Sequence, residues 1–288
     1  DDGIVVRGAK AHQTGACNSH EVIVMPTVAM REGDEDFAVS FSTPANAPGI
    51  SYIYGRQSCD TRKLEDSDLD VGNMRYGGQE ALMVFDDVFV PWERVYLCGE
   101  IEFSGALVER FAGFHRQSYG GCKAGVGDVL IGAAALAADY NGVARASHIK
   151  DKLIEMTHLN ETLFSCGIAC SAEGVRMPAG NYQIDMLLAN VCKQNVTRFP
   201  YEIARLAEDI AGGLMVTMPS AQDLADEKIG PIVEKFLVGS CDTPAIDRMR
   251  VLRLIENLTI GAGAVGYRTE SLHGAGSPQA QRIMIARQ

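Results

Sequence analysis

Apolar residues in the first hundred positions form short runs separated by turn residues. Five of these runs predict strands: Gly3–Arg7, Glu21–Val28, Phe37–Ser42, Tyr52–Tyr54 and Ala81–Val90. No run with helical spacing separates them. We therefore expect an antiparallel sheet or barrel rather than parallel βαβ units.

After about residue 100 the apolar positions recur at helical spacing. Helices are predicted over Val126–Tyr140, from Ser147 as N-cap to Cys170, over Asn181–Val191 and over Arg248–Ala262. Pro200 is expected to kink a helix or mark its end. Long Ala-rich helices that are nearly apolar on one side need partners on more than one face, so a bundle is expected. The pattern thus predicts an α+β fold, with a β-domain at residues 1–100 and a helical bundle at 101–288.

Composition narrows the class of protein. The chain has 288 residues, of which 47% are hydrophobic, and this apolar content excludes a largely disordered chain. A net charge of -11 argues against sequence-independent nucleic-acid binding, which needs a basic surface. The longest charge-free stretch, 37–55, contains Pro44 and Pro48 and cannot be a membrane helix. No signal peptide precedes the first strand, so a soluble, cytoplasmic protein is expected.

Two further features concern the ends of the chain and its thiols. The chain lacks an initiator Met, and residues 279–288 are predicted to form a helix that no Gly or Pro ends. We therefore expect the chain to be the larger part of a longer protein. Eight cysteines stand at irregular spacings. They are expected to be free thiols or metal ligands rather than a disulfide framework.

The segment with the most candidate chemistry holds His115, Tyr119, Cys122 and Lys123 around the glycine pair 120–121. A helix places His115 and Tyr119, four residues apart, on one face. His115 and Cys122 are two turns apart, about 10 Å by rise, which is too far for one Zn²⁺. A multi-iron cluster, or a break at the glycines, would bring them to one centre. A core histidine and a packed thiol remain the alternative.

Other candidates are weaker on spacing alone. Cys166 and Cys170 form a CxxxC pair, but their apolar neighbours favour packing. Glu270 lies three residues before His273, and Glu80 directly precedes a predicted strand. Either carboxylate could serve an active site or be solvated.

Two short motifs suit a ligand with a planar ring and phosphates. His12, Gln13 and Thr14 follow the first predicted strand and offer hydrogen bonds to a heteroaromatic ring, although turn chemistry explains them equally well. Gly212 and Gly213 permit close backbone approach to a phosphate, or close helix packing. They match neither the P-loop nor the dinucleotide-binding fingerprint.

Longer runs carry a family resemblance over essentially the whole chain. FHRQSYGGCKAGVGD at 114–128 and GYRTESLHGAGSPQAQR at 266–282, together with 151–174 and 181–220, resemble the 4-hydroxybutyryl-CoA dehydratase branch of a flavoprotein family. That family includes 4-hydroxyphenylacetate 3-monooxygenase and shares the acyl-CoA dehydrogenase fold. The resemblance implies an N-terminal helical domain outside this chain, a middle β-domain, a C-terminal four-helix bundle and a homotetramer.

The resemblance also implies two cofactors. A [4Fe–4S] cluster is held by three Cys and one His, and the motif carries His115 and Cys122 into that set, with the other two Cys in the N-terminal domain. FAD lies between the β-domain and the bundle, with His12, Gln13 and Thr14 facing its isoalloxazine. Gly212 and Gly213 meet the ADP part of the FAD of the same or of a neighbouring subunit.

The implied reaction is the radical dehydration of 4-hydroxybutyryl-CoA to crotonyl-CoA, with isomerisation of vinylacetyl-CoA, in anaerobic 4-hydroxybutyrate metabolism. A base takes the C2 proton, FAD removes one electron, and an open iron acts as a Lewis acid on the departing hydroxyl. By resemblance His115 is the candidate base, and Glu270 orients the imidazole or relays its proton. Tyr119 and Lys123 bind the hydroxyl, and Glu80 positions one of them.

Two alternatives remain open from the sequence. A flavin-dependent aromatic hydroxylase of the same family would use reduced flavin and oxygen without a cluster. A non-catalytic subunit would pack in the oligomer without a complete site. The iron and flavin content of the protein distinguishes the three hypotheses: dehydratase, aromatic hydroxylase and non-catalytic subunit.

Overall fold

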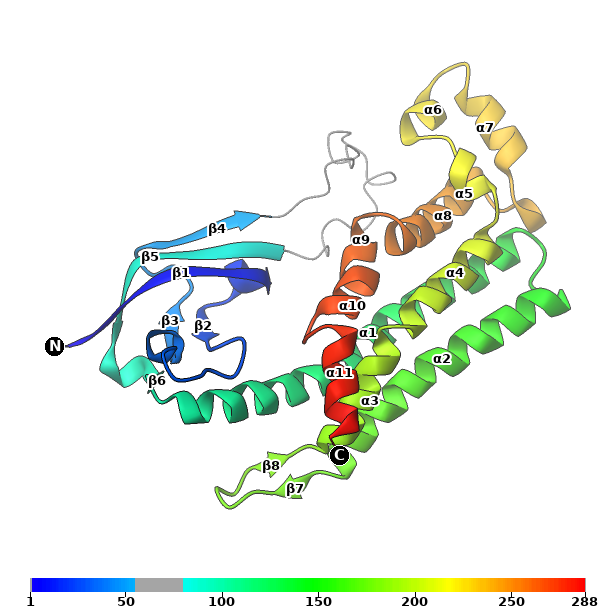
Figure 1. The fold of residues 1–288 in the computed structure, drawn as a ribbon. Coiled ribbons are helices and arrows are strands. Elements are labelled where there is room, and N and C mark those ends of the chain that lie inside the picture. Colours follow the sequence, from blue (N-terminus) through cyan, green and yellow to red (C-terminus); the bar gives the residue numbers. More distant parts are fainter. Residues whose placement is uncertain (1, 55–79, 288) are drawn as a thin grey trace. The chain divides into compact units, whose positions relative to one another are not determined.

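The computed structural model describes residues 2–54 and 80–287 (Figure 1). Two compact units are present, and the described residues divide between them as 2–54 with 80–112, and 113–287. Secondary structure changes from strands to helices at Ile101, whereas the compact units divide within helix α1, between Ala112 and Gly113. The sequence-based boundary between 1–100 and 101–288 stays a prediction.

The first unit, here called the β unit, consists of two three-stranded antiparallel sheets, so the antiparallel prediction is confirmed. In the first sheet the strand order is β1 (Gly3–Thr14), β5 (Glu80–Pro91), β4 (Ile50–Tyr54). In the second sheet the order is β2 (Glu21–Val24), β3 (Val39–Pro44), β6 (Val95–Cys98). Strand β6 was not predicted, because it is short and follows a 3₁₀ turn over Trp92–Arg94.

Residues from both sheets form the core of the β unit. Val88 and Val90 of β5 are fully buried, and the intervening Phe89 is exposed, as strand alternation requires. Phe41 of β3 meets Phe85 of β5 edge to face, with ring centroids 5.9 Å apart. Each such buried side chain contributes about 1.5–3 kcal/mol by removing apolar surface from water.

Strand β1 is longer than predicted. Two register shifts, one after Val6 and one after Lys10, let it continue to Thr14 against β5. His12 lies in the second shift and has a φ of 62°. The expectation that His12, Gln13 and Thr14 follow the strand is therefore wrong, because the irregular segment is absorbed within the ladder.

Helix α1 (Ile101–Tyr140) runs without interruption through the glycine pair 120–121. Close packing explains the first glycine: a Cβ at Gly120 would lie 2.9 Å from both the Gly167 Cα and the Leu163 carbonyl oxygen of α2. A Cβ at Gly121 would meet nothing within 4 Å. The glycines therefore permit a tight helix crossing and do not break α1.

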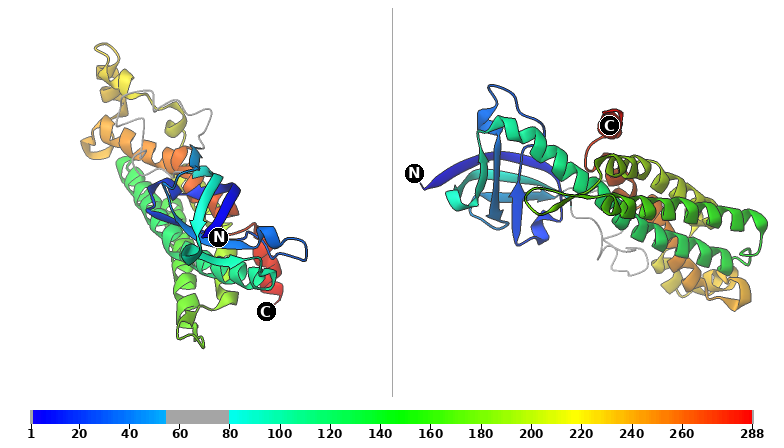
Figure 2. Two further views of the ribbon diagram at one scale, coloured as in Figure 1. Left: turned by 90° about the vertical axis from the view of Figure 1, so that its left-hand side faces the viewer. Right: turned by 90° about the horizontal axis from the view of Figure 1, so that it is seen from below.

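The second unit, the helical unit, buries one large core. Its members come mainly from four helices: α1, α2 (Ser147–Ala172), α4 (Phe199–Ala211) and α8 (Ala245–Thr259). These helices run alongside one another in the views of Figures 1 and 2. The predicted α+β class is confirmed, with sandwich-like sheets followed by a helical region.

Several predicted helix ends need correction. Ser147 is the first residue of α2, and its N-cap is Ala146, which makes no side-chain capping bond. Helix α3 (Met186–Val196) begins five residues later than predicted, because Asp185 caps it by accepting from the Leu188 N–H at 2.7 Å. Pro200 lies in the first turn of α4, where its missing N–H costs nothing.

Short elements complete the helical unit. Before α8 lie α5 (Leu214–Thr217), α6 (Ala221–Ala225) and α7 (Gly230–Leu237), none of which was predicted, and a two-stranded hairpin joins α2 to α3. After α8 come α9 (Ala262–Ala264), the π-helix η7 (Val265–Thr269), α10 (Glu270–His273) and α11 (Pro278–Ala286). The π-helix is notable because such wide turns frequently occur at functional sites.

Helix α1 is the one helix of the described chain that is long and apolar enough to meet the criterion for a membrane span. In this helix Leu130, Ala134 and Ala138 are fully buried in the core of the helical unit. That packing accounts for part of the apolar character of the helix, because 44% of its most apolar window is buried.

Candidate active site

One face of α1 carries three of the predicted site residues. His115 and Tyr119 stack with ring centroids 5.3 Å apart and planes inclined by 27°. The Lys123 Nζ lies 5.0 Å from the centroid of the Tyr119 ring. Tyr119 is 2% exposed and Lys123 6% exposed. The i, i+4 spacing seen in the sequence thus gives a continuous, largely buried row of imidazole, phenol and ammonium.

Glu270 joins this row from a segment 147 residues away in sequence. The Lys123 Nζ donates to the Glu270 Oε2 at 3.0 Å and to the Gly266 carbonyl oxygen at 2.6 Å. The Lys123 side chain is 8% exposed and that of Glu270 26% exposed, so the pair is mostly shielded from water. Lys123 thereby ties the π-helix η7 and the start of α10 to α1.

Gly274 makes room for the Tyr119 phenol. A Cβ at this position would lie 1.9 Å from the Tyr119 Oη, an impossible contact. The end of α10 therefore packs directly against the phenol, and only glycine fits there.

Two buried cations of this cluster were not predicted from the sequence. Lys193 of α3 is fully buried, with its Nζ 5.0 Å from the Tyr119 ring centroid and 2.5 Å from the Ser271 carbonyl oxygen. Arg116 donates to the Ala275 carbonyl oxygen at 3.0 Å and to the Asn190 Oδ1 at 2.8 Å.

A sequence signal for Lys193 existed. It shares the buried stripe of α3 with Ala189, Cys192 and Val196, where a lone cation is unusual. Arg116 has no comparable signal, because its partners come from α3 and from the segment after α10.

The cluster brings three cations and one carboxylate into one largely buried place. Burial lowers the pKa of His115, and the neighbouring Lys193, Arg116 and Lys123 lower it further against the opposing effect of Glu270. Burial also lowers the pKa of Lys193 to about 8, helped by repulsion from Arg116 and Lys123. The neutral imidazole is therefore the favoured form of His115 near neutral pH.

Cys122 lies one turn beyond Tyr119 on the same helix and is exposed. Desolvation raises its thiol pKa, while the adjacent Lys123 acts in the opposite direction. Because α1 is unbroken, His115 and Cys122 are two turns, about 10 Å of rise, apart. In residues 2–54 and 80–287, no three His, Cys, Asp or Glu side chains are grouped so as to hold a metal ion.

The separation of His115 and Cys122 therefore excludes a site for a single metal ion and is compatible with a multi-iron cluster. A single ion cannot reach both side chains, since ligand bonds are near 2.0–2.3 Å. An imidazole and a thiolate at this separation suit two different irons of one cluster, and they supply two of its four protein ligands. The residues present fit part of an iron–sulfur site.

The CxxxC pair of α2 forms a separate thiol cluster. Cys170 donates to the Cys166 carbonyl oxygen at 3.0 Å, and both Cys170 and Cys192 are fully buried beside Ile184 and Ala189. A hydrogen bond from Cys192 lowers the pKa of Cys166 to about 7, whereas burial raises that of Cys170 to about 12. These contacts match the expected packing role.

The residues assigned to the flavin are more exposed than those of the buried cluster. In the β unit His12 and Thr14 are exposed, and the Gln13 amide donates to the Ala11 carbonyl oxygen at 2.6 Å. Thr14 pairs with Glu80 across the β1–β5 ladder, but the Glu80 side chain lies outside the described residues.

In the helical unit Gly212 ends α4 with a φ of 72°, and Gly213 follows in a helical conformation. A Cβ at either glycine would meet nothing within 4 Å. Open backbone of this kind fits close approach by a ligand, and it excludes the alternative of close helix packing at these two positions.

The β unit also contains a cavity of about 850 Å³. Its wall along β1 runs from Ile4 to Lys10 and stops short of His12. Lys10 donates to the Met25 carbonyl oxygen at 2.8 Å, and burial lowers its pKa. The cavity is thus separate from the predicted flavin residues.

Comparisons with known proteins confirm the resemblance seen in the sequence. The chain is 69% identical over its whole length to 4-hydroxybutyryl-CoA dehydratase/vinylacetyl-CoA-Δ-isomerase from Clostridium aminobutyricum, of which it covers 61%. It superposes with a TM-score of 0.97 on an oxygen-tolerant archaeal 4-hydroxybutyryl-CoA dehydratase from N. maritimus. This chain and the archaeal dehydratase are 60% identical, and the match covers all of this chain and 57% of the archaeal chain. The chain therefore spans about three fifths of these relatives.

More distant relatives share the fold. The oxygenase component of 4-hydroxyphenylacetate 3-monooxygenase in complex with FAD matches with a TM-score of 0.86 at 25% identity, over all of this chain and 59% of that one. Glutaryl-CoA dehydrogenase matches with a TM-score of 0.58 at 14% identity, over 99% of this chain and 58% of its own, which shows the acyl-CoA dehydrogenase fold alone.

Family models cover nearly the whole chain. The model of the 4-hydroxyphenylacetate 3-hydroxylase N-terminal region matches residues 1–97, and that of the C-terminal region matches residues 104–288. The chain therefore belongs to the 4-hydroxyphenylacetate 3-hydroxylase family.

Proposed function

We propose that the protein containing this chain dehydrates 4-hydroxybutyryl-CoA to crotonyl-CoA and isomerises vinylacetyl-CoA, with FAD and a [4Fe–4S] cluster. One observation carries the proposal: His115 and Cys122 stand two turns apart on an unbroken helix, in a chain 69% identical to a dehydratase of this name. Sequence relatives named as monooxygenases are only 22–27% identical to the chain.

The residues divide between the two cofactors. His115 and Cys122 would supply two of the protein ligands of the cluster, and the other two would be cysteines beyond the 288 residues. His12, Gln13 and Thr14 face the flavin ring, while the open backbone at Gly212 and Gly213 accommodates the ADP part. When bound, FAD supplies one-electron chemistry, and the cluster supplies a Lewis acid for the departing hydroxyl.

His115 takes the C2 proton of the thioester. Its surroundings favour the neutral imidazole, whose single basic nitrogen either binds iron or accepts a proton. His115 would therefore take the C2 proton with that nitrogen released from the cluster. The Glu270 carboxylate, held by Lys123 at 3.0 Å, orients the imidazole or relays its proton. A positioned acid–base group of this kind contributes about 10²–10⁴-fold to the rate.

Tyr119 and Lys123 bind the hydroxyl that leaves from the substrate. Both side chains are less than 10% exposed, so water competes poorly for their protons. The Tyr119 ring is fixed by its stack on His115 and by the backbone at Gly274.

The assembly follows from the same family membership. We propose a cytoplasmic homotetramer that binds FAD and the acyl-CoA and whose subunits contain a β-domain at 1–100 and a four-helix bundle at 101–288. The likeness to glutaryl-CoA dehydrogenase supports the fold in this proposal.

The test is an anaerobic preparation of the full-length protein with iron and flavin quantified. About four irons and one FAD per subunit, with oxygen-independent formation of crotonyl-CoA, are expected. A yellow, iron-free protein that hydroxylates a phenol with oxygen would instead assign the monooxygenase reaction. A protein with neither cofactor would be a non-catalytic subunit.

A further inference from the structure

Lys193 has no role in the mechanism above, yet it lies within the cluster. Its side chain is fully buried, and its Nζ contacts the Ser271 carbonyl oxygen at 2.5 Å and faces the Tyr119 ring at 5.0 Å. In the part of the chain that the structure describes, no carboxylate oxygen lies within 4 Å of this Nζ. A buried ammonium without a carboxylate partner is costly, because desolvation opposes its charge.

The local sequence gives no structural reason for a cation at this position. Lys193 shares its buried stripe with Ala189, Cys192 and Val196, so an apolar residue such as Met would continue the stripe at lower cost. Local rules are most often broken in this way at functional sites. The lowered pKa of Lys193 is a consequence of the same burial.

The contacts of Lys193 show what its ammonium does. Ser271 directly follows Glu270, and the carbonyl that Lys193 holds is therefore part of the turn that carries this carboxylate. Lys123 holds the same segment from α1, through Gly266 and through Glu270 itself. Two lysines from two different helices thus bracket Glu270.

The two lysines also share an aromatic ring. Each Nζ lies 5.0 Å from the Tyr119 centroid, within the range of a cation–π interaction. The Tyr119 ring is therefore held by the imidazole of His115 and by both ammonium groups. Movement of the Lys193 ammonium would therefore change the positions of both the Tyr119 phenol and the Glu270 carboxylate.

We propose that Lys193 is a positioning residue of this site, which fixes the Glu270 turn through Ser271 and the Tyr119 ring through its charge. Its kinetic consequence rests on the proposed dehydration. The groups that face it are Arg116, Lys123, Glu270, Tyr119 and the Cys192 thiol.

The test is Lys193→Met in the full-length holoenzyme. The expected result is a fall in kcat of about 10–100-fold with KM changed less than about threefold and with iron and flavin retained. Lys193→Gln keeps a donor for the Ser271 carbonyl, so it should recover part of the loss, and it carries the test if the Met variant does not fold. An unchanged kcat in either folded variant would overturn the proposal.

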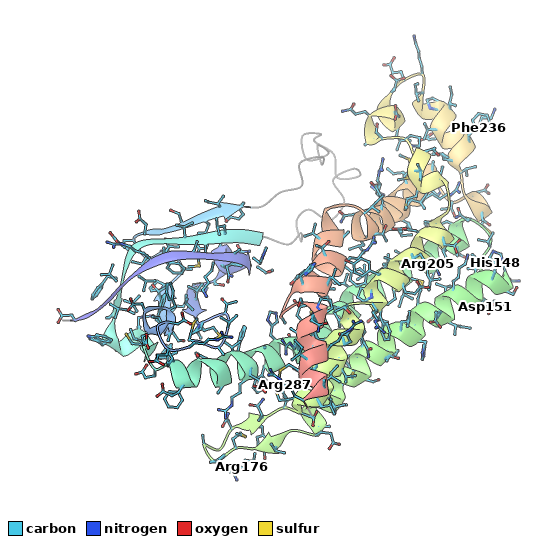
Figure 3. The ribbon with its side chains drawn as sticks, in the orientation of Figure 1. His148, Asp151, Arg176, Arg205, Phe236 and Arg287 are labelled. Carbon is cyan, nitrogen blue, oxygen red and sulfur yellow. The ribbon has the colours of Figure 1, made fainter. Side chains whose placement is uncertain are left out.

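A matched control removes a lysine–aromatic contact that lies outside the cluster. The Lys235 Nζ lies 5.3 Å from the ring centroid of Phe236, but this pair belongs to α7, where Phe236 is 70% exposed (Figure 3). Lys235→Met should leave kcat, KM and cofactor content unchanged. An equal loss in this variant would show that the effect of Lys193→Met is not specific to the cluster.

A double-mutant cycle separates positioning from general structural support. Because Lys193 acts partly through Glu270, Lys193→Met should slow the Glu270→Gln variant by a smaller factor than it slows the wild-type protein. Fully additive losses would contradict the proposal.

A crystal structure of Lys193→Met gives a result that does not depend on the reaction. The Ser271 carbonyl is expected to shift and the Lys123–Glu270 ion pair to lengthen from 3.0 Å to beyond 4 Å. An unchanged ion pair would refute the positioning role even if the protein catalyses a different reaction. If the wild-type protein lacks dehydratase activity but the ion pair still lengthens in the variant, only the proposed function is refuted.

Discussion

The two groups of candidate residues differ in what already surrounds them. In the helical unit, Tyr119, Lys123 and Lys193 are buried and contact one another, Glu270 or backbone carbonyls. The residues assigned to the flavin are the exposed His12 and Thr14 and the half-buried Gln13 on β1, together with open backbone at the end of α4. The first group is preorganised by the fold, whereas the second presents accessible surface to a ligand.

This difference has a consequence that can be measured. Substitutions in the buried cluster should change stability and catalysis together, because each side chain is both a packing partner and a site residue. Substitutions in the open group should change cofactor affinity and leave the stability of the apoprotein nearly constant.

The largest effect is expected for Cys122→Ala in the full-length protein. Loss of a thiolate ligand should remove most of the iron and lower the dehydration rate by more than about 10³-fold, since the open iron supplies the Lewis acid. Iron content and anaerobic turnover are the measurements. Cys98→Ser is the control, because Cys98 is also an exposed cysteine but lies in the β unit. Retained iron in Cys122→Ala would contradict the ligand assignment.

Lys123→Met should have the next largest effect. It leaves Glu270 and the Gly266 carbonyl without their donor, which should destabilise the protein by about 2 kcal/mol and slow turnover by at least about tenfold. Urea unfolding and steady-state kinetics measure the two consequences. Glu202→Gln breaks an exposed ion pair with Arg205 and should change stability by less than about 0.5 kcal/mol. Equal effects of both substitutions would remove the distinction between cluster and surface.

Gly213→Ala tests the open group. Gly213 is helical, and a Cβ there meets nothing, so alanine should leave the apoprotein as stable or make it up to about 1 kcal/mol more stable. The same methyl group should lower FAD affinity about tenfold if the flavin approaches this backbone. Flavin titration and thermal unfolding of the same sample give both numbers. Unchanged FAD affinity would place the ADP part elsewhere.

The smallest effect concerns the thiol cluster and has a pH dependence. Because the hydrogen bond from Cys192 lowers the pKa of Cys166 to about 7, half of Cys166 is thiolate near that pH and more above it. Cys192→Ala should raise this pKa and slow alkylation of Cys166 several-fold at pH 7, whereas Cys192→Ser keeps a donor and should not. Iodoacetamide labelling followed by peptide mass spectrometry measures the rates. Equal rates in the two variants would exclude Cys192 as the cause.

The part of this site that lies on one helix could be predicted from the sequence. The i, i+4 spacing of His115 and Tyr119 is a local property of α1, and so is the two-turn separation of His115 and Cys122. Sequence spacing cannot show that Lys123 meets Glu270 across 147 residues, because that contact depends on how α1 and α10 pack. The family resemblance supplied both residues without their contact.

The differences between the predicted and observed fold have a similar origin. The extension of β1 depends on register shifts against β5, and Gly120 of the unbroken α1 packs closely on Gly167 of α2. Lys193 was not predicted because it belongs to no motif, and only its place on a buried stripe distinguishes it. In each case the observed structure depends on tertiary packing, which local sequence propensity does not determine.

The central claim is that His115 and Cys122 bind the same iron–sulfur cluster. The most direct test is an anomalous difference map, recorded at the iron edge, of anaerobic crystals of the full-length protein. We predict a multi-iron peak in contact with the imidazole of His115 and the sulfur of Cys122. A well-ordered His115 and Cys122 with no iron beside either would contradict the claim.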